Sequence, residues 1–393
     1  MIMNKTLFSL FLAIFSLPNV YADTVRVATF NVSMEASNYQ PKGASEHSGE
    51  VLLNLLESGE HQQIRNIAEI IQRVAPDIIL LNEFDYYPEA TPTAVSLFVK
   101  NYLNKSQQGQ TAIDYPYQYI APVNTGVATS FDLDNNGEKT GNAGDAYGWG
   151  MYPGQYGMAF LSRYPIDVAA VRTFQHFLWR DMPDALQITK PASGEPWFAP
   201  QEWAAVRLSS KSHWDIPVTI GGKKLHILAM HPTPPTFDGP EDSNGKRNHD
   251  EIRLMADYLT PQRAEYIYDD NGEKGGFAGQ RFVLLGDFNA ADIGDKHRPG
   301  VIEQLTEHPL VNNSVIPQSE GGSESAEESY SSRFTAYWGA RADYVLPSKQ
   351  GLTVQGGGVF WPVKASPLYR LVKDRQSSSD HRLVWIDVVL DED

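Results

Sequence analysis

The chain contains no cysteine, which excludes disulfide bonds, thiolate metal sites and a lipid-modified N-terminal cysteine. It is also short of basic residues, because 32 Lys and Arg stand against 48 Asp and Glu, and its formal net charge is −16. An acidic chain repels polyanions, which disfavours a protein that coats nucleic acid. The same balance still permits an enzyme that meets phosphate through local cations and a bound metal ion.

Long hydrophobic runs are absent except for one at the N-terminus. Lys5 precedes the apolar run Leu7 to Leu17, and Val20-Tyr21-Ala22 then offers small residues at the positions that a signal peptidase reads. A run of about eleven residues is too short to span a bilayer comfortably. We therefore expect a signal peptide at residues 1–22 with cleavage near Ala22, a secreted or periplasmic protein, and no stable membrane insertion.

The remaining chain has neither internal repeats nor an interdomain linker. With 393 residues and 41% hydrophobic content, it can bury one large core or two ordinary ones. We expect one catalytic domain at residues 23–393 with long loop insertions, present as a monomer.

Strands and helices alternate in the opening segment. An apolar strand is predicted at 25–31, an amphipathic helix at 61–74 and a buried strand at 78–83. This β-α-β order favours a right-handed crossover within one sheet and an α/β fold. Further elements are predicted as strands at 156–162, 204–208, 217–220, 224–230, 282–285, 342–346 and 383–390, and as helices at 92–103 and 248–259.

Polar side chains follow these apolar strands at their ends. Any single one is more often a turn or cap residue than a ligand, but a series of suitable residues at successive strand ends favours a site. Together they supply hard oxygen ligands for Mg²⁺, Mn²⁺ or Ca²⁺ and two imidazoles, a combination that suits phosphoryl chemistry. The residues are Asn31, Glu83, His231, Asp287, Asn289, Asp343, Asp380 and His381.

The segments around these residues resemble the endonuclease/exonuclease/phosphatase superfamily of metal-dependent phosphoesterases, which includes the pancreatic-type deoxyribonucleases. The matches follow the family's order across nearly all of residues 23–393, and the Gly-Asp-Phe-Asn and Ser-Asp-His segments are specific when taken together. The resemblance implies a four-layered α/β sandwich, with two central mixed sheets flanked by helices. The segments are Thr29 to Asn31, Leu81 to Glu83, Leu161 to Ile166, Ala229 to Pro232, Gly286 to Asn289, Ala342 to Leu346 and Ser379 to His381.

The resemblance also implies roles for the matched residues. Glu83 would bind a catalytic Mg²⁺ or Mn²⁺ with Asn31 beside it, and Asp380 would add a metal contact. Asp287 would position or deprotonate the attacking water, while Asn289 would hold a phosphate oxygen. His381 would be the general base or the electrostatic partner of the phosphate, oriented by Asp343, and His231 would be an acid or phosphate ligand.

Two loops carry further candidates. Asp132, Asp134 and Asn136 have the spacing that opens an EF-hand-like calcium loop, but Ala143 stands where a bidentate Glu is expected, and Asp145 could substitute for it. A structural Ca²⁺ site and a plain Asx-rich turn are both consistent with this segment. After His231, the cation Arg247 is a candidate phosphate-binding residue, and the alternative is a solvated loop with Asn248 as the helix cap.

Other polar and aromatic groups have simpler explanations. His213 could reach the site, but a loop histidine satisfied by its neighbours is the better interpretation. Trp179, Trp197, Trp203 and Trp214 could stack a ring, yet such residues more often anchor a long insertion.

The sequence therefore predicts an exported metal-dependent phosphoesterase that hydrolyses phosphodiester or phosphomonoester bonds. A secreted non-specific nuclease is the alternative within the enzymes, so nucleic acid is a possible substrate. A non-catalytic binding protein on the same fold is a remote alternative, because Glu83, Asp287 and His381 are all present.

Overall fold

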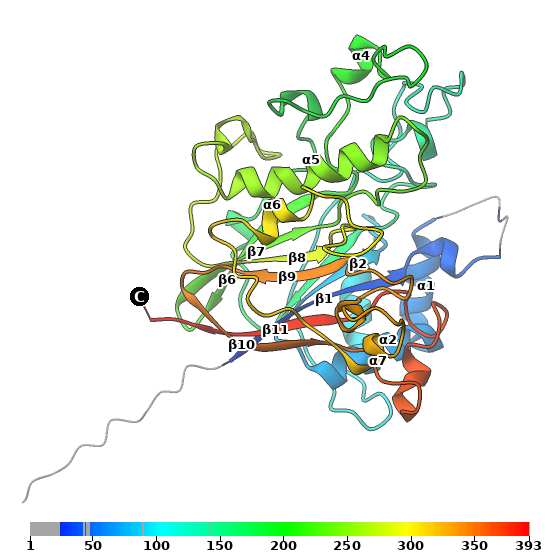
Figure 1. Cartoon of the computed structure of the whole chain (residues 1–393). Coiled ribbons are helices and arrows are strands. Elements are labelled where there is room, and N and C mark those ends of the chain that lie inside the picture. The colour runs from blue at the N-terminus through cyan, green and yellow to red at the C-terminus, as the bar shows by residue number, and fades with distance from the viewer. Residues whose placement is uncertain (1–23, 42–43, 45–47, 89, 142, 393) are drawn as a thin grey trace, which may run out of the picture.

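Two β-sheets form the centre of the molecule (Figure 1). The computed structural model describes residues 24–41, 44, 48–88, 90–141 and 143–392, so the predicted signal peptide lies outside the described residues. The six-stranded sheet has the order β10-β11-β1-β2-β4-β3, and the five-stranded sheet has the order β5-β6-β7-β8-β9. The first sheet contains β1 (Val25–Met34), β2 (Ile78–Phe84), β3 (Tyr117–Ile120), β4 (Met158–Ser162), β10 (Leu352–Val359) and β11 (Val384–Leu390). The second contains β5 (Arg172–Thr173), β6 (His213–Ile220), β7 (Lys223–Met230), β8 (Phe282–Asp287) and β9 (Asp343–Pro347).

Both sheets are mixed. β1 pairs with β2 in parallel and β7 pairs with β8 in parallel, whereas the other pairs are antiparallel. The helices are α1 (Glu50–Ser58), α2 (Gln62–Val74), α3 (Ala94–Phe98), α4 (Pro200–Trp203), α5 (Ser243–Tyr258), α6 (Glu303–Thr306) and α7 (Glu320–Ser323). Among the described residues no helix combines the length and the hydrophobicity that a membrane crossing requires.

The expected crossover connects β1 and β2 through α2. The apolar face of α2 is buried in the core that β1 and β2 share. The helix ends at Ala75, which has a left-handed conformation and donates its N–H to the carbonyl of Ile71 at 2.8 Å. Pro76 follows and cannot continue the helix.

The alternation of side chains along β7 separates the two hydrophobic cores. Ile227 and Ala229 belong to the core between the sheets, while Leu228 and Met230 belong to a second core that contains residues of α5 and α6. Figure 1 shows α5 and α6 over the second sheet, with α1 and α2 on the side of the first. The order of layers is therefore helix, sheet, sheet, helix, and the predicted sandwich is confirmed.

The strand predicted at residues 204–208 is wrong. These residues follow α4, which begins at Pro200 and is capped by Glu202 as it accepts the N–H of Ala199 at 2.7 Å, and the N–H groups of Ala204 to Val206 bond back to carbonyls of that helix. Only Arg207 makes an isolated bridge, to Leu178. Local capping thus prevails over an apolar run that reads as a strand.

Candidate active site

The strand ends bring the predicted residues of both sheets together. β7 and β8 run in parallel, so His231, the residue after β7, lies beside Asp287 at the end of β8. β9 runs antiparallel to β8 and begins at Asp343, which pairs directly with Asp287. In the other sheet, β1 and β2 are parallel and carry Asn31 and Glu83 towards the same place.

Asn31 connects the two sheets through its amide group. Its Nδ2 donates to Oε1 of Glu83 at 3.0 Å and to Oδ2 of Asp287 at 3.0 Å, while its Oδ1 accepts the N–H of Ser33 at 3.1 Å. All three amide contacts fix the orientation of the side chain. The spacing between the two carboxylates is therefore set before any ligand arrives.

His381 is held by a buried carboxylate. Its Nδ1 lies 2.8 Å from Oδ2 of Asp343, and that oxygen also accepts the hydroxyl of Thr335 at 2.7 Å. Its Nε2 lies 3.5 Å from Oδ2 of Asp287. Burial lowers the pKa of His381, but Asp343 and Asp287 outweigh it and raise the pKa to about 10. His381 is thus an imidazolium at neutral pH.

Asp287 is the carboxylate on which these contacts converge. Burial raises its pKa to about 7, although the charge of His381 and the hydrogen bond from Asn31 act in the opposite direction. A carboxyl group that titrates near neutral pH can take up and release a proton under working conditions. This is the property needed to activate water.

His231 differs from His381 in its state of charge. Its ring is buried, and its Nε2 lies 3.6 Å from Oδ2 of Asp287. Burial, reinforced by positive charge on Lys211 and His381, holds the pKa of His231 well below its usual value. The Nε2 atoms of one charged and one neutral imidazole therefore lie near the same oxygen of Asp287, and such a separation of pKa values suits proton transfer.

Glu83 and Asp380 are the candidate carboxylates for a metal ion. Oδ1 of Asp380 accepts the hydroxyl of Ser33 at 3.0 Å. The guanidinium of Arg375 lies between the two acids, 3.4 Å from Oε2 of Glu83 and 3.5 Å from Oδ2 of Asp380. Two carboxylates that share one cation offer the hard oxygen ligands that Mg²⁺ or Mn²⁺ prefers. Asn31 stands beside the site, but its carbonyl oxygen is already bonded to Ser33.

Asn289 adopts the left-handed conformation after β8, with φ of 51°. Its backbone N–H donates to Oδ1 of Asp287 at 3.0 Å, and its Nδ2 donates to the carbonyl of Pro232 at 3.1 Å. One hydrogen of the Asn289 side-chain amide thereby orients the side chain, and the second is available to a ligand. Asn289 is therefore held next to both Asp287 and the residue after His231.

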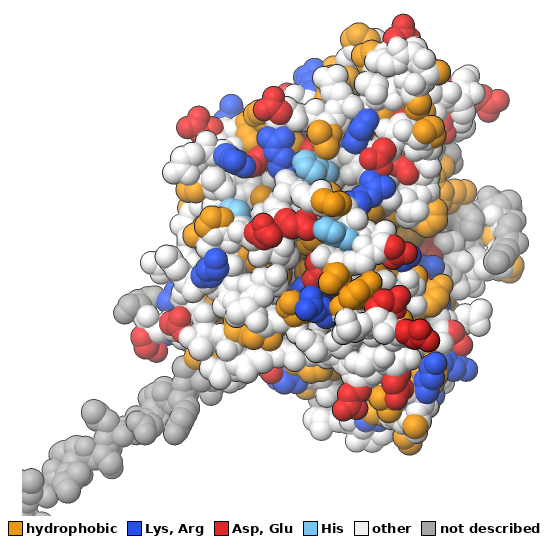
Figure 2. Space-filling model, viewed as in Figure 1, with side chains coloured by type: hydrophobic (Ala, Val, Ile, Leu, Met, Phe, Trp, Pro, Cys, Tyr) orange, Lys and Arg blue, Asp and Glu red, His pale blue; other side chains and the backbone are white. Residues whose placement is uncertain are grey.

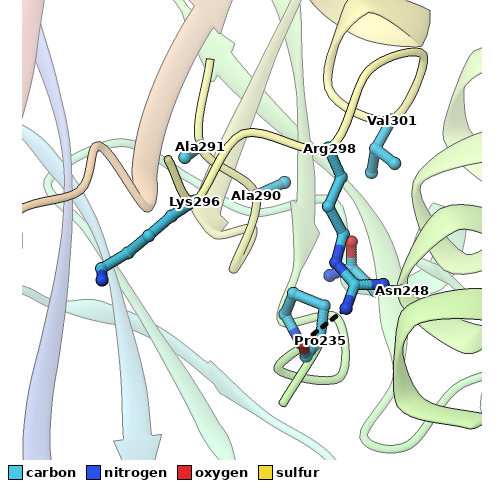
Figure 3. Close-up of a pocket in the computed structure, with 7 residues that line it drawn as sticks. All are labelled: Pro235, Asn248, Ala290, Ala291, Lys296, Arg298 and Val301. Atoms are coloured by element: carbon cyan, nitrogen blue, oxygen red, sulfur yellow. Dashed lines mark hydrogen bonds between the residues drawn. The ribbon is translucent and has the colours of Figure 1, made fainter. Parts of the chain in front are cut away.

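A small cavity of about 10 Å³, enough for roughly one water molecule, lies beside the loop after Asn289. In Figure 3 the guanidinium of Arg298 reaches the carbonyl of Pro235, a hydrogen bond of 3.1 Å, while Lys296 extends away from it. The lining residues include neither Asp287 nor any residue whose side chain contacts it. They are Pro235, Asn248, Ala290, Ala291, Lys296, Arg298 and Val301.

The acidic loop forms a separate cluster. Carboxylate oxygens of Asp132, Asp134 and Asp145 lie within 4.8 Å of one another, and those of Asp145 accept the backbone N–H groups of Leu133 and Thr140. Asn136 instead donates its Nδ2 to Asp134 at 3.0 Å and accepts the N–H of Glu138. The loop thus combines three carboxylates with an Asx-type turn.

In the described part of the chain, Arg247 makes no contact with Asp287. It is within α5, and its guanidinium donates to the carbonyls of Leu208, Tyr147 and Arg207 at 2.5 to 2.9 Å. Asn248 also lies inside α5 and is not its cap, because the helix begins at Ser243. The geometry supports an anchoring role for Arg247, and its role in phosphate binding stays a prediction.

His213 and the tryptophans have structural partners. His213 is buried with Nδ1 at 3.1 Å from the hydroxyl of Ser209 and Nε2 at 3.0 Å from the carbonyl of Glu251. Trp179 packs against Trp203 with ring centroids 5.5 Å apart. These contacts agree with the simpler interpretations given above.

Three residues near the site were missed from the sequence. Arg375 lies five positions before Asp380, Trp338 packs its ring edge-on against His381 at 4.7 Å, and Lys211 is buried near His231. Only Lys211 had a signal, since it lies two positions before His213, which was considered for the site from the sequence.

Comparisons with known proteins extend these observations. The model of the Endonuclease/Exonuclease/phosphatase family matches residues 28–381. No curated protein matches the chain.

Several solved structures are similar at low identity. An endonuclease/exonuclease/phosphatase from Beutenbergia cavernae is 16% identical, with a TM-score of 0.47 over 93% of this chain and 72% of that one. Staphylococcus aureus beta toxin with bound magnesium is 12% identical, with a TM-score of 0.45 over 94% and 100%. Sphingomyelinase C from Streptomyces griseocarneus is 12% identical, with a TM-score of 0.44 over 93% and 99%.

The family match covers most of the chain and includes each of the strand-end residues around Asp287. The protein therefore belongs to the Endonuclease/Exonuclease/phosphatase family, a family of metal-dependent phosphoric ester hydrolases.

Proposed function

We propose that this protein is an exported phosphoesterase in which Asp287 activates the attacking water. The observation that carries the proposal is the arrangement around this carboxylate. Asn31 donates to it at 3.0 Å, and the Nε2 atoms of His381 and His231 lie 3.5 and 3.6 Å away. A buried carboxyl with a pKa of about 7 between a charged and a neutral imidazole is suited to proton transfer at neutral pH.

The remaining residues have distinct roles in this proposal. His381, kept cationic by Asp343, stabilises the negative charge that develops on the phosphate. Neutral His231 and the second amide hydrogen of Asn289 bind phosphate oxygens on the other side of Asp287. Since His381 is protonated at neutral pH, we favour its role as electrostatic partner over that of general base.

Glu83 and Asp380, with Asn31 beside them, would hold the divalent cation. Mg²⁺ or Mn²⁺ would supply Lewis-acid charge to the phosphate when bound. Arg375 would leave its position between the two carboxylates as the metal ion enters.

Export follows from the sequence at residues 1–22, which predicts cleavage near Ala22 and a secreted or periplasmic location. This prediction, and that of a monomer, is supported by the sequence pattern alone.

A secreted non-specific nuclease is the second candidate. The family supports it, while the net charge of −16 speaks against a long nucleic-acid footprint. On the face shown in Figure 2, Lys and Arg side chains are interspersed with Asp and Glu and form no continuous basic band. We therefore favour small phosphate esters or head-group esters.

The test is a hydrolysis panel with Mg²⁺ or Mn²⁺ that contains a bis-aryl phosphodiester, an aryl phosphomonoester, phospholipid head-group esters and plasmid DNA. We expect cleavage of small esters, and a rate that falls roughly 10²- to 10⁴-fold in Asp287→Asn. Asp295→Asn is the matched control, because Asp295 is exposed eight residues further on. Cleavage of DNA alone would establish the nuclease, and equal rates in Asp287→Asn would refute the site.

Calcium in the loop of Asp132, Asp134 and Asn136 stays a separate structural prediction. The three gathered carboxylates support it. Calcium should raise the melting temperature of the wild type but not that of Asp134→Asn, while Asp287→Asn should respond as the wild type does. An identical response of Asp134→Asn would leave the loop an Asx-rich turn.

A further inference from the structure

Lys211 lies at the same edge of the second sheet as His231. It precedes β6 by two residues, and the first residue of β6, His213, pairs with Met230 at the end of β7. Antiparallel strands continue in register, so the chain before β6 passes the chain after β7. Lys211 is therefore placed beside His231 and Pro232, the residue that positions Asn289.

The side chain of Lys211 is only 5% exposed. Burying an ammonium group without a partner is costly, and buried lysines are normally paired. Among the described residues, no side-chain hydrogen bond and no ion pair is found for this ammonium group, and its Nζ is not one of the fully buried polar atoms that lack a partner. The side chain is thus buried along its length while its charged end stays open to a ligand.

Glu251 is the acidic group whose charge acts most strongly on Lys211, but among the described residues it forms no ion pair with the ammonium group. Glu251 accepts the backbone N–H of Ser210 at 2.7 Å and that of Thr233 at 2.6 Å. These two bonds use one carboxylate oxygen each and tie the residue before Lys211 to the segment after His231. Glu251 thus fixes the backbone next to Lys211.

The charges that act on Lys211 are those of the candidate active site. Burial lowers its pKa, while Glu251, Asp287 and Glu83 act in the opposite direction. Lys211 in turn lowers the pKa of His231. The positive charge of Arg247, whose guanidinium is bonded to backbone carbonyls, also lowers the pKa of Lys211.

We propose that Lys211 is a phosphate-binding residue, whose ammonium group meets an oxygen of the substrate phosphate between His231 and Asp287. This inference rests on the proposed function and names a contact of that same site. It assigns to Lys211 the part that the sequence suggested for Arg247. A phosphate dianion or diester anion supplies the partner that the ammonium group lacks in the protein.

The test measures binding without turnover. Calorimetric titration with inorganic phosphate in the presence of Mg²⁺ compares the wild type with Lys211→Met, which keeps the length of the side chain and removes its charge. We expect binding to weaken roughly ten- to hundredfold, and KM for the bis-aryl phosphodiester to rise. Lys224→Met is the matched control, because Lys224 is exposed near the opposite end of β7 and paired with Asp167 at 2.8 Å.

A structural role would give a different pattern. If Lys211→Met and Lys211→Gln bind phosphate as tightly as the wild type while their melting temperatures fall, the inference is overturned. If the wild type itself does not bind phosphate, it is overturned as well. Failure of the proposed function is seen separately, as absence of hydrolysis by the wild type across the panel.

Discussion

The orientation and charge of each side chain in this site depend on the groups that it contacts. Asp343 accepts from Thr335 and holds His381, and His381 in turn faces Asp287. Each buried group thus influences the electrostatics of the next, and the low polarity of the surroundings strengthens each interaction. The electrostatic state of His381 depends on Asp343 in particular.

Replacing Asp343 with Asn should therefore lower the pKa of His381 from about 10. Because the pKa in the folded protein lies above the ordinary value of 6.5, the pair stabilises the fold fully below pH 6.5, and this contribution is lost as the pH rises through about 10. Asp343→Asn should cost roughly 3–5 kcal/mol below pH 6.5, with a smaller deficit at high pH. Urea unfolding at several pH values checks this, and a deficit that grows with pH would contradict it.

Arg375 gives a second prediction at this scale. Its guanidinium stands between Glu83 and Asp380, so it competes with a divalent cation. Since Arg375 is 44% exposed and solvent screens its charge, Arg375→Ala should tighten Mg²⁺ binding only about three- to tenfold. Lys373→Ala is the control two positions earlier. Calorimetric titrations that show the same Mg²⁺ affinity for both variants would argue against competition.

Sequence patterns predicted the individual site residues because their motifs are short and lie directly after strands. The pattern expected Asn31, Glu83, Asp287 and His381 near strand ends, and the structure brings these four residues together, while their roles stay predictions. It could not find Arg375, since a lone arginine in a loop carries no period or motif. It also favoured Arg247 over Lys211, because the direction of a long side chain depends on tertiary packing.

Among the elements, strand β8 shows how backbone geometry positions the chemistry. Gly286 has φ of 148°, and a Cβ there would lie 1.9 Å from the carbonyl oxygen of Met230. Only glycine lets β8 approach the end of β7 this closely. The approach brings Asp287 beside His231.

Gly286→Ala should therefore separate the ends of β7 and β8. We expect a loss of roughly 1–3 kcal/mol in stability and a loss of hydrolysis, because Asp287 moves. Gly356→Ala in β10 is the matched control, since its Cβ would meet nothing within 4 Å. Urea unfolding and rate measurements on both variants check this, and equal behaviour of the two glycines would show that the close approach is unimportant.

Long periodic elements were predictable, whereas short and capped ones were not. α2 was expected at 61–74 and spans Gln62–Val74. A long repeating apolar face specifies a helix that packs against a core whatever its neighbours are. The segment 204–208 was misread as a strand, since the N–H groups of Ala204 to Val206 bond to carbonyls of the preceding short helix. α1 and β10 carry weaker patterns and were not predicted.

At the scale of the whole molecule, net charge should govern the approach of polyanions. At −16, the protein repels DNA, and salt screens this repulsion over a Debye length of about 10 Å at 0.1 M. Any KM for DNA should therefore fall as salt rises at fixed Mg²⁺, whereas the KM for a small diester should change little. Kinetics at low and physiological salt check this, and a KM for DNA that rises with salt would indicate a basic footprint.

The central claim is that the residues around Asp287 form a metal-dependent phosphoesterase site. The most direct measurement is hydrolysis of a bis-aryl phosphodiester by chelator-treated protein as Mg²⁺ is returned, for the wild type and Glu83→Gln. We predict no turnover without metal, recovery of the wild type, and a far higher Mg²⁺ requirement for Glu83→Gln. Undiminished hydrolysis by the metal-free wild type, or an unchanged Mg²⁺ requirement in Glu83→Gln, would contradict the account.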